Sequence, residues 1–152
     1  MSILINILVF LAAFAFMEFF AWFAHKYIMH GLGWFLHKSH HEPHQGFFEL
    51  NDVYVLLFAL PAIILMYIGS SDWGIIFWCG AGVSGYGISY FVFHDIIVHR
   101  RVAHGHRPRT SYMKRLIRAH KIHHKNLGKE NGTSFGFLVA SSKYDVPLRE
   151  VE

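Results

Sequence analysis

Apolar residues form three long stretches along the chain, and polar or charged positions separate them. Within these stretches the chain carries one charged residue, Glu18. A helix needs roughly 17–25 apolar residues to cross a bilayer. The pattern therefore predicts three transmembrane helices, at about residues 2–24, 53–69 and 73–93.

The second and third apolar stretches are joined by Gly69-Ser70-Ser71-Asp72, a sequence typical of a tight turn. These two spans are therefore predicted to form a hairpin that leaves and returns on one side of the membrane. The polar segments 25–52 and 94–152 consequently lie on that same side. An odd number of spans puts the N-terminus on the other side.

Composition also indicates a chain that lies in lipid. Of the 152 residues, 53% are hydrophobic and 16% are charged, whereas soluble domains carry about 25% charged residues. Residues 94–152 contain twelve of the 14 lysines and arginines but only five of the 10 acidic residues. Because loops rich in lysine and arginine stay in the cytoplasm, we predict a multi-pass protein of the inner (cytoplasmic) membrane with both polar segments on the cytoplasmic face. The basic surface is equally well explained by attraction to the anionic headgroups of the lipid bilayer and by docking of an acidic protein partner, and nucleic acid is not expected.

The predicted fold class is an all-α integral membrane protein, a single domain over residues 1–152. Three transmembrane helices carry a cytoplasmic helical cap made of residues 25–52 and 94–152. In the cap we expect a loop with a short helix near His37–His41, and an amphipathic helix from about Ser111 to Lys125.

The polar segments contain a doubled histidine pattern. A His-x4-His pair is followed each time by a His-x2-His-His box. The ten histidines are His25, His30, His37, His40, His41, His94, His99, His120, His123 and His124. Neutral imidazole is a common ligand of iron, zinc and copper, and ten imidazoles exceed what one metal ion can use. The repeat therefore predicts a histidine-rich site for two metal ions where the spans leave the membrane.

Helix geometry separates the two kinds of box. On an α-helix of about 100° per residue, positions i, i+3 and i+4 share one sector. Each His-x2-His-His box is therefore expected to aim three rings at one place. Positions i and i+5 lie about 140° apart, so each His-x4-His pair either spreads across two metals or is brought together by a π-bulge or a helix end.

Iron suits this histidine set better than the other common metals. Structural zinc sites take four ligands and usually use cysteine, and a haem would leave most of the rings unused. Two iron ions with about five imidazoles each leave positions for oxygen, and zinc is a substitute to expect in a purified sample. Asp52 and Asp95 are candidates for balancing the positive charge, but each is equally well explained as an interfacial acid or a helix cap.

Glu18 lies seven residues before His25, near the same helix face but about 10 Å deeper in the bilayer. An acid at that depth is costly and indicates a function. The distance excludes a shared metal, so we expect either a buried hydrogen bond to another helix or a place in a substrate cavity. By contrast, we expect His44, His104 and His106, which lie outside the boxes, to be ordinary polar residues.

The segment Gly80-Ala81-Gly82-Val83-Ser84-Gly85 matches the dinucleotide-binding pattern G-x-G-x-x-G. That pattern requires a soluble unit with a preceding strand, whereas this segment lies inside a predicted span. The glycines therefore predict a small-residue face for close packing against a helix or a flat, lipid-like ligand.

The sequences around the boxes are more specific than the boxes themselves. They include Ala24-His25-Lys26-Tyr27-Ile28-Met29-His30-Gly31, Ser39-His40-His41-Glu42-Pro43, Phe93-His94-Asp95 and Ser134-Phe135-Gly136-Phe137-Leu138. Over about residues 17–138 the chain resembles the bacterial β-carotene hydroxylases, which belong to the membrane fatty-acid/sterol hydroxylase superfamily. The resemblance extends to all four boxes.

This resemblance implies a non-haem di-iron monooxygenase that hydroxylates C3 of the β-ionone ring. Such an enzyme converts β-carotene through β-cryptoxanthin to zeaxanthin, with O2 as co-substrate and two electrons from a ferredoxin-type donor. The ten box histidines would be its iron ligands, and no residue beyond them is assigned to catalysis.

Two other functions stay open. One is a membrane hydroxylase acting on fatty acids or sterols, which its products would distinguish. The other is a metal transporter or store, which would line the middle of the bilayer with polar or acidic residues. Glu18 alone is charged within the predicted spans, which argues against transport.

Overall fold

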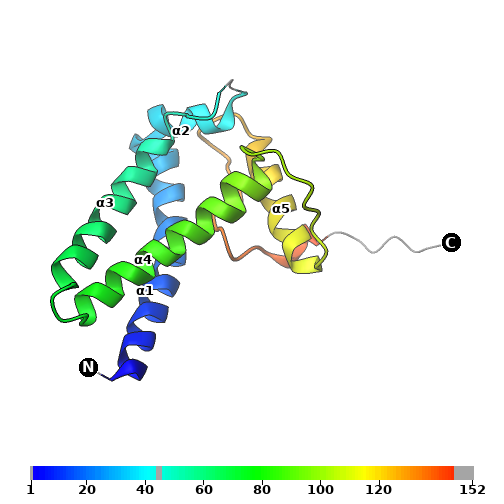
Figure 1. The fold of residues 1–152 in the computed structure, drawn as a ribbon. Coiled ribbons are helices and arrows are strands. Elements are labelled where there is room, and N and C mark those ends of the chain that lie inside the picture. Colours follow the sequence, from blue (N-terminus) through cyan, green and yellow to red (C-terminus); the bar gives the residue numbers. More distant parts are fainter. Residues whose placement is uncertain (1, 44–45, 146–152) are drawn as a thin grey trace.

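The computed structural model describes residues 2–43 and 46–145, and these residues form helices and loops without any strand. The predicted all-α fold is thus confirmed (Figure 1). In chain order the elements are α1 (Ile3–Phe23), the π-helix η1 (Ala24–Leu32), α2 (Trp34–His41), α3 (Asp52–Gly69), α4 (Ile75–Tyr90), the π-helix η2 (Phe91–Val98), α5 (Ser111–His124) and the 3-10 turn η3 (Ser142–Tyr144).

Three continuous helical stretches are long and apolar enough to cross a membrane: Ile3–Leu32, Asp52–Gly69 and Ile75–Val98. The three predicted spans are therefore present as helices. The first and third extend beyond the predicted ends because each continues as a π-helix. The expectation of a loop directly after residue 24 was wrong, since helix continues through η1, with a kink at Gly31, and α2 begins at Trp34.

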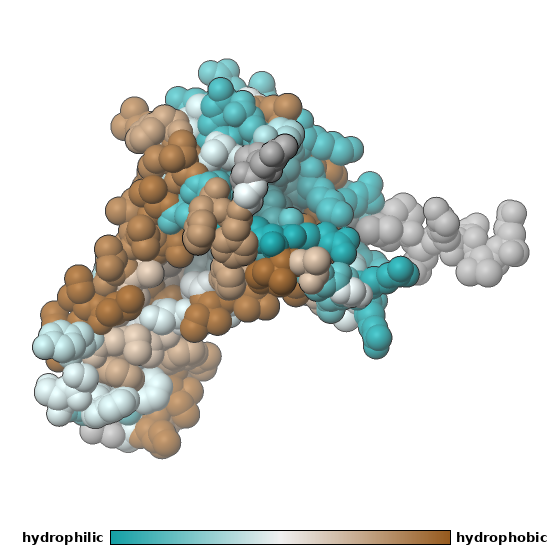
Figure 2. Space-filling view, turned by 45° about the horizontal axis from the view of Figure 1, so that its top comes forward, coloured by the Kyte–Doolittle hydropathy of each residue, from teal (hydrophilic) through white to brown (hydrophobic). Residues whose placement is uncertain are grey.

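The long helices present apolar side chains outward, as a membrane protein requires. Leu8, Leu56, Leu60 and Ile63 are each more than half exposed. In Figure 2 hydrophobic surface covers the long helices, while hydrophilic residues gather at the end that carries α2 and α5. This separation follows from the sequence pattern, because charged residues are confined almost entirely to the segments outside the spans.

Helix α4 packs against both α1 and α3, and its glycines make these approaches close. A Cβ atom on Gly80 would lie 2.7 Å from the Ala62 carbonyl oxygen of α3. A Cβ atom on Gly82 would lie 2.5 Å from the Phe10 carbonyl oxygen of α1. The predicted small-residue face is therefore confirmed: Gly80 packs closely against α3, and Gly82 packs closely against α1.

Segments from both halves of the chain meet at one end of the three long helices (Figure 1). The turn between α3 and α4 lies at the opposite end. Beside α2 and α5, the irregular segment 125–141 runs back toward α1, where Phe137 joins Met17 and Tyr86 in a buried apolar cluster. The predicted hairpin therefore brings the two histidine-bearing segments together.

Candidate metal centre

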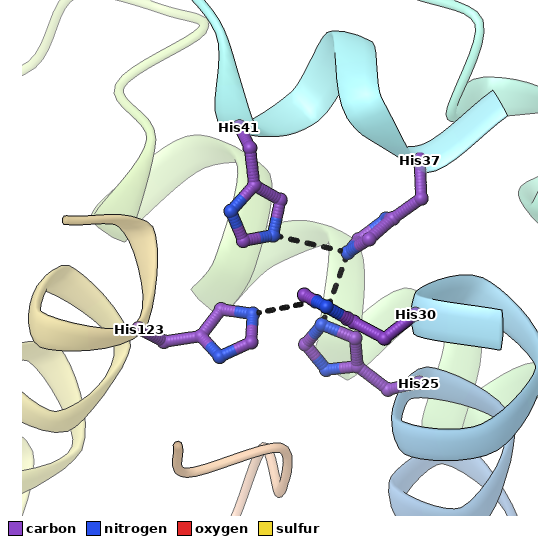
Figure 3. Close-up of side chains that lie close together, drawn as sticks. All are labelled: His25, His30, His37, His41 and His123. Carbon is purple, nitrogen blue, oxygen red and sulfur yellow. Dashed lines mark hydrogen bonds between the residues drawn. The ribbon is translucent and has the colours of Figure 1, made fainter. Parts of the chain in front are cut away.

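The ten box histidines form two groups of five. In each group one ring nitrogen from every residue lies within 4.8 Å of the other four. The first cluster contains His25, His30, His37, His41 and His123, and Figure 3 shows their rings converging from η1, α2 and α5. The second cluster contains His40, His94, His99, His120 and His124. The predicted number of about five imidazoles per site matches this division.

The two π-helices explain how each His-x4-His pair meets in one cluster. A π-helix has i→i+5 hydrogen bonds, so residues five apart lie on the same side of it. In η2 the N–H of His99 donates to the carbonyl oxygen of His94 at 2.9 Å. The ring centroids of His94 and His99 are 4.5 Å apart, and those of His25 and His30 are 5.2 Å apart. Of the two explanations offered by the spacing, the structure selects the π-helix.

The expectation that each His-x2-His-His box aims three rings at one place was wrong. In α2, His37 and His41 enter the first cluster, but His40 enters the second. The box in α5 divides in the opposite sense: His120 and His124 enter the second cluster and His123 enters the first. The i+3 ring is about 60° from the i ring and about 100° from the i+4 ring. Because the two clusters are neighbours, this rotation is enough to place the i+3 ring in the other cluster.

The clusters meet where two rings stack. His41 of the first cluster and His124 of the second have centroids 4.5 Å apart and planes 18° apart. The stacked pair of His41 and His124 is thus a direct contact between the two clusters, and each His-x2-His-His box supplies rings to both of them.

Hydrogen bonds fix the orientation of every ring in the first cluster. Each Nδ1 lies 2.7–3.0 Å from an oxygen that can only accept, so each Nδ1 carries the hydrogen. The accepting oxygens are the carbonyls of Phe135, Lys129, Asn126 and Thr133, for His25, His30, His41 and His123, and Oδ1 of Asn51 for His37. All five Nε2 atoms are thus left with a free lone pair pointing into the cluster.

These lone pairs fit a bound cation. The Nε2 atom of His37 lies 3.1 Å from that of His25 and 3.2 Å from that of His41. The Nε2 atoms of His30 and His123 are 3.2 Å apart. Two lone pairs at this distance repel unless a cation lies between them. Nitrogen ligands about 2.1 Å from a metal and at right angles to each other are about 3.0 Å apart, so the spacing suits a metal ion.

The second cluster has the same character but different partners. Nδ1 of His40 donates to the Glu49 carboxylate at 2.7 Å, and Nδ1 of His94 lies 3.3 Å from the Asp95 carboxylate. Nε2 of His124 is buried and has no hydrogen-bond partner among the described residues. A buried nitrogen of this kind costs about 1–3 kcal/mol unless something binds it, which again favours a metal ion.

The histidines of the two His-x2-His-His boxes, in α2 and α5, have lowered pKa values and are therefore uncharged at neutral pH. Burial lowers the pKa of His37 and that of His123 to about 3, with nearby His41 adding to the effect in both cases. Burial likewise lowers the pKa values of His40, His41, His120 and His124. Neutral imidazole is the form that binds metal, so these rings are prepared for ligation without a proton having to leave.

The three acidic candidates lie in different places. Asp95 contacts His94 directly. Asp52 accepts the N–H of Glu49 at 3.0 Å and pairs with Arg101 at 2.8 Å, without contacting a ring. Glu18 accepts the hydroxyl of Tyr86 on α4 at 2.8 Å, which confirms the expected hydrogen bond to another helix.

Three residues at the site were not identified from the sequence: Glu49, Asn51 and Arg101. Glu49 and Asn51 orient His40 and His37 from a non-helical segment, where no periodicity predicts a contact. His104 bonds to the Ile96 carbonyl and to the N–H of His106, outside both clusters as expected. His44 lies outside the described residues.

A cavity of about 400 Å³ lies between α1, α3 and α4. Its walls are mostly apolar and include Phe58, Val83 and Phe93. It is also lined by His25 of the first cluster and by His94 and His120 of the second. Ile63 and Ile88, which are exposed on the helix surface, border the same space. An apolar path therefore connects the outer surface of the helices to both clusters.

Comparison with known proteins agrees with this arrangement. The family model for fatty acid hydroxylases matches residues 10–142. The chain is 51% identical to a β-carotene hydroxylase of Pantoea ananas over 136 residues, which cover 88% of this chain and 78% of that protein. It is 44% identical to one from Pseudescherichia vulneris, covering 97% of this chain and 85% of the relative.

More distant relatives include the chloroplastic β-carotene 3-hydroxylase 2 of Arabidopsis thaliana. It is 35% identical over 133 residues, which cover 85% of this chain and 43% of that protein. No solved structure matches the chain. The resemblance predicted from the flanking segments is thus confirmed.

Proposed function

This chain belongs to the fatty acid hydroxylase family, and we propose that it hydroxylates C3 of the β-ionone rings of β-carotene, giving β-cryptoxanthin and then zeaxanthin. The proposed enzyme is a non-haem di-iron monooxygenase that uses O2 and two electrons from a ferredoxin-type donor. The observation that carries the proposal is the apolar cavity, which joins the exposed surface of the helices to both histidine clusters.

The ten box histidines are proposed as the ligands of two iron ions, five for each ion. Bare Nε2 lone pairs in the first cluster and the buried Nε2 of His124 in the second support this assignment. When bound, the iron ions would supply the activation of oxygen. Zinc would occupy the same nitrogens but has no redox chemistry, so a zinc-loaded sample should be inactive.

The cavity accounts for how the protein would hold such a substrate. A volume of about 400 Å³ is at the small end of ligand pockets, so we propose that it encloses one ring of the carotenoid while the polyene stays in lipid. Apolar and aromatic walls exclude water and restrict how the ring turns. Histidines of both clusters line the cavity, so an enclosed ring would lie beside them.

We further propose that the clusters lie on the cytoplasmic side of the inner membrane. The outer face of α5 supports this orientation, because it carries exposed basic residues: Lys114, Arg118, Lys121 and Lys125. Such a surface suits anionic lipid headgroups, and it equally suits an acidic ferredoxin-type donor.

The decisive experiment supplies iron-loaded protein with O2, a reducing system and β-carotene, followed by mass spectrometry of the products. We expect β-cryptoxanthin first and zeaxanthin later, and none from zinc-loaded protein. If no 3-hydroxylated product forms where the Pantoea ananas relative makes it, the substrate assignment is wrong. Because the matching family is that of the fatty acid hydroxylases, the same preparation should also be offered fatty acids and sterols.

A further inference from the structure

The two clusters differ in the partners that hold their rings. In the first cluster every Nδ1 donates to a neutral oxygen, four times a backbone carbonyl and once the amide of Asn51. In the second cluster His40 and His94 contact the carboxylates of Glu49 and Asp95. A carboxylate partner makes an imidazole a more basic ligand and fixes its orientation. Each cluster therefore offers five imidazoles, but the hydrogen-bond partners of these rings differ between the two clusters.

Arg101 joins the carboxylates of the second cluster. Its guanidinium contacts Glu49, lies 2.8 Å from an Asp52 oxygen and lies 3.1 Å from an Asp95 oxygen. The Arg101 side chain is only 10% exposed, and the side chains of Glu49 and Asp95 are 1% and 6% exposed. When ion pairs are shielded from water to this extent, losing one partner is costly because the remaining charge stays buried without compensation.

The backbone also directs Arg101 toward this network. Arg100 has a φ of 57°, in the left-handed region that residues other than glycine seldom adopt. The turn that results lets the N–H of Arg101 donate to the Asp95 carbonyl at 3.0 Å. Main chain and side chain of Arg101 therefore both bind Asp95, and the guanidinium reaches across to the segment that precedes α3.

We infer that Arg101 is a positioning residue for the second cluster alone, so the two metal sites are unequal and can be weakened separately. Without the guanidinium, the carboxylates of Glu49, Asp52 and Asp95 would repel one another. His40 and His94 would then lose the partners that orient them. The first cluster has none of these carboxylates among its Nδ1 partners and should keep its metal. The inference rests on the metal-binding part of the proposed function and not on its substrate.

The test titrates metal-free full-length protein in detergent with Co2+, whose optical absorption reports ligation by nitrogen. We expect two equivalents to bind to the wild type. In R101Q one equivalent should bind as before, and the other should bind about 10–100-fold more weakly, as is typical when such a partner is lost. R101K should fall between these because it keeps the positive charge but loses the planar, five-donor fork with which the guanidinium contacts Glu49, Asp52 and Asp95. Arg109→Gln is the matched control, since Arg109 is an exposed arginine outside both histidine clusters and outside the Arg101 network.

Two histidine backgrounds identify which site changes. In H123A the first cluster is damaged, and adding R101Q should weaken the remaining strong site. In H99A the second cluster is damaged, and adding R101Q should leave the remaining site unchanged. Equal weakening of both sites, or no weakening in H123A, would overturn the inference. If R101Q does not fold, R101K in the same backgrounds gives the same comparison. Failure of the wild type to bind any metal would instead refute the metal centre itself.

Discussion

Replacing Glu18 tests how an acid inside the first span supports a metal centre that it does not touch. Its Oε1 atom accepts the backbone N–H groups of Phe137, Leu138 and Val139 at 3.1, 2.8 and 3.2 Å. Its Oε2 atom accepts the Tyr86 hydroxyl at 2.8 Å. The bound segment begins just after Thr133 and Phe135, whose carbonyls orient His123 and His25. Glu18 therefore anchors part of the first cluster through the backbone.

The contacts give the expected size of the effect. Glu18→Ala leaves four donors without their acceptor, and each buried one costs about 1–3 kcal/mol. Val139 is exposed and its N–H can bind water, so three donors remain unpaired and the free energy of unfolding should fall by about 3–9 kcal/mol. Glu18→Gln keeps one acceptor oxygen for the three N–H groups and should lose only about 1 kcal/mol. Tyr86→Phe removes a single donor and should resemble Glu18→Gln.

Unfolding followed by circular dichroism in detergent measures this order, and metal analysis measures its consequence. Glu18→Gln should bind the same amount of metal as the wild type, whereas Glu18→Ala should lose metal from the first cluster. Glu42→Ala is the control: Glu42 pairs with Lys38 on the surface, and removing it should change stability by less than about 1 kcal/mol. Equal stability and full metal content in Glu18→Ala would refute the anchoring function.

Four further predictions concern the clusters, the cavity and the packing of the helices. His123→Ala should abolish turnover and lower the bound metal measured by mass spectrometry, and normal values of both would contradict the site. Gly87 lines the cavity, and a Cβ atom added to it would have no neighbouring atom within 4 Å. Gly87→Leu should therefore keep the fold but reduce kcat/KM for β-carotene by about 10–200-fold. By contrast, Gly80→Ala should lower the unfolding temperature, because its Cβ atom would meet the Ala62 carbonyl oxygen. The pKa values of His37 and His123, lowered to about 3, mean that only the unfolded metal-free chain gains their protons between pH 6.5 and 3. Stability should therefore be highest above pH 6.5 and fall by about 1.4 kcal/mol per pH unit for each histidine as the pH drops toward 3, and a pH-independent unfolding midpoint would contradict this.

Much of the fold could be predicted because lipid imposes a simple rule on sequence. Long uncharged stretches become spans, and the turn at residues 69–72 makes two of them a hairpin, as observed. The amphipathic helix was expected to start near Ser111, and α5 does so. What the pattern did not predict is where the first and third helices end. They continue through η1 and η2, where polar residues enter the apolar pattern and the hydrogen bonding changes from i→i+4 to i→i+5. The His-x4-His spacing allowed a π-bulge there, but it equally allowed a helix end.

The sequence predicted which histidines form the candidate site, but it did not predict how they divide between the two clusters. Spacing identified all ten histidines, yet i, i+3 and i+4 positions on a helix share a broad sector, and spacing alone does not show whether one centre or two lie beneath it. The orientation of the rings depends on carbonyl oxygens of residues 126, 129, 133 and 135. Every residue has such an oxygen, so no residue type indicates these contacts.

The division follows one scheme in both clusters. Each cluster takes a His-x4-His pair from the end of a span, an i, i+4 pair from one cap helix and the i+3 ring from the other cap helix. Because α2 and α5 each supply both clusters, neither cluster can form until both halves of the chain have met. The doubled pattern in the sequence would by itself suggest two equal sites. The difference between the clusters lies in residues outside the pattern. Glu49 and Asp95 contact rings of the second cluster and Arg101 joins these two carboxylates, while neutral oxygens accept from every Nδ1 of the first. If each cluster binds a metal ion as proposed, equal ligands would give two sites of different strength, and the residues responsible are ones that histidine spacing does not reveal.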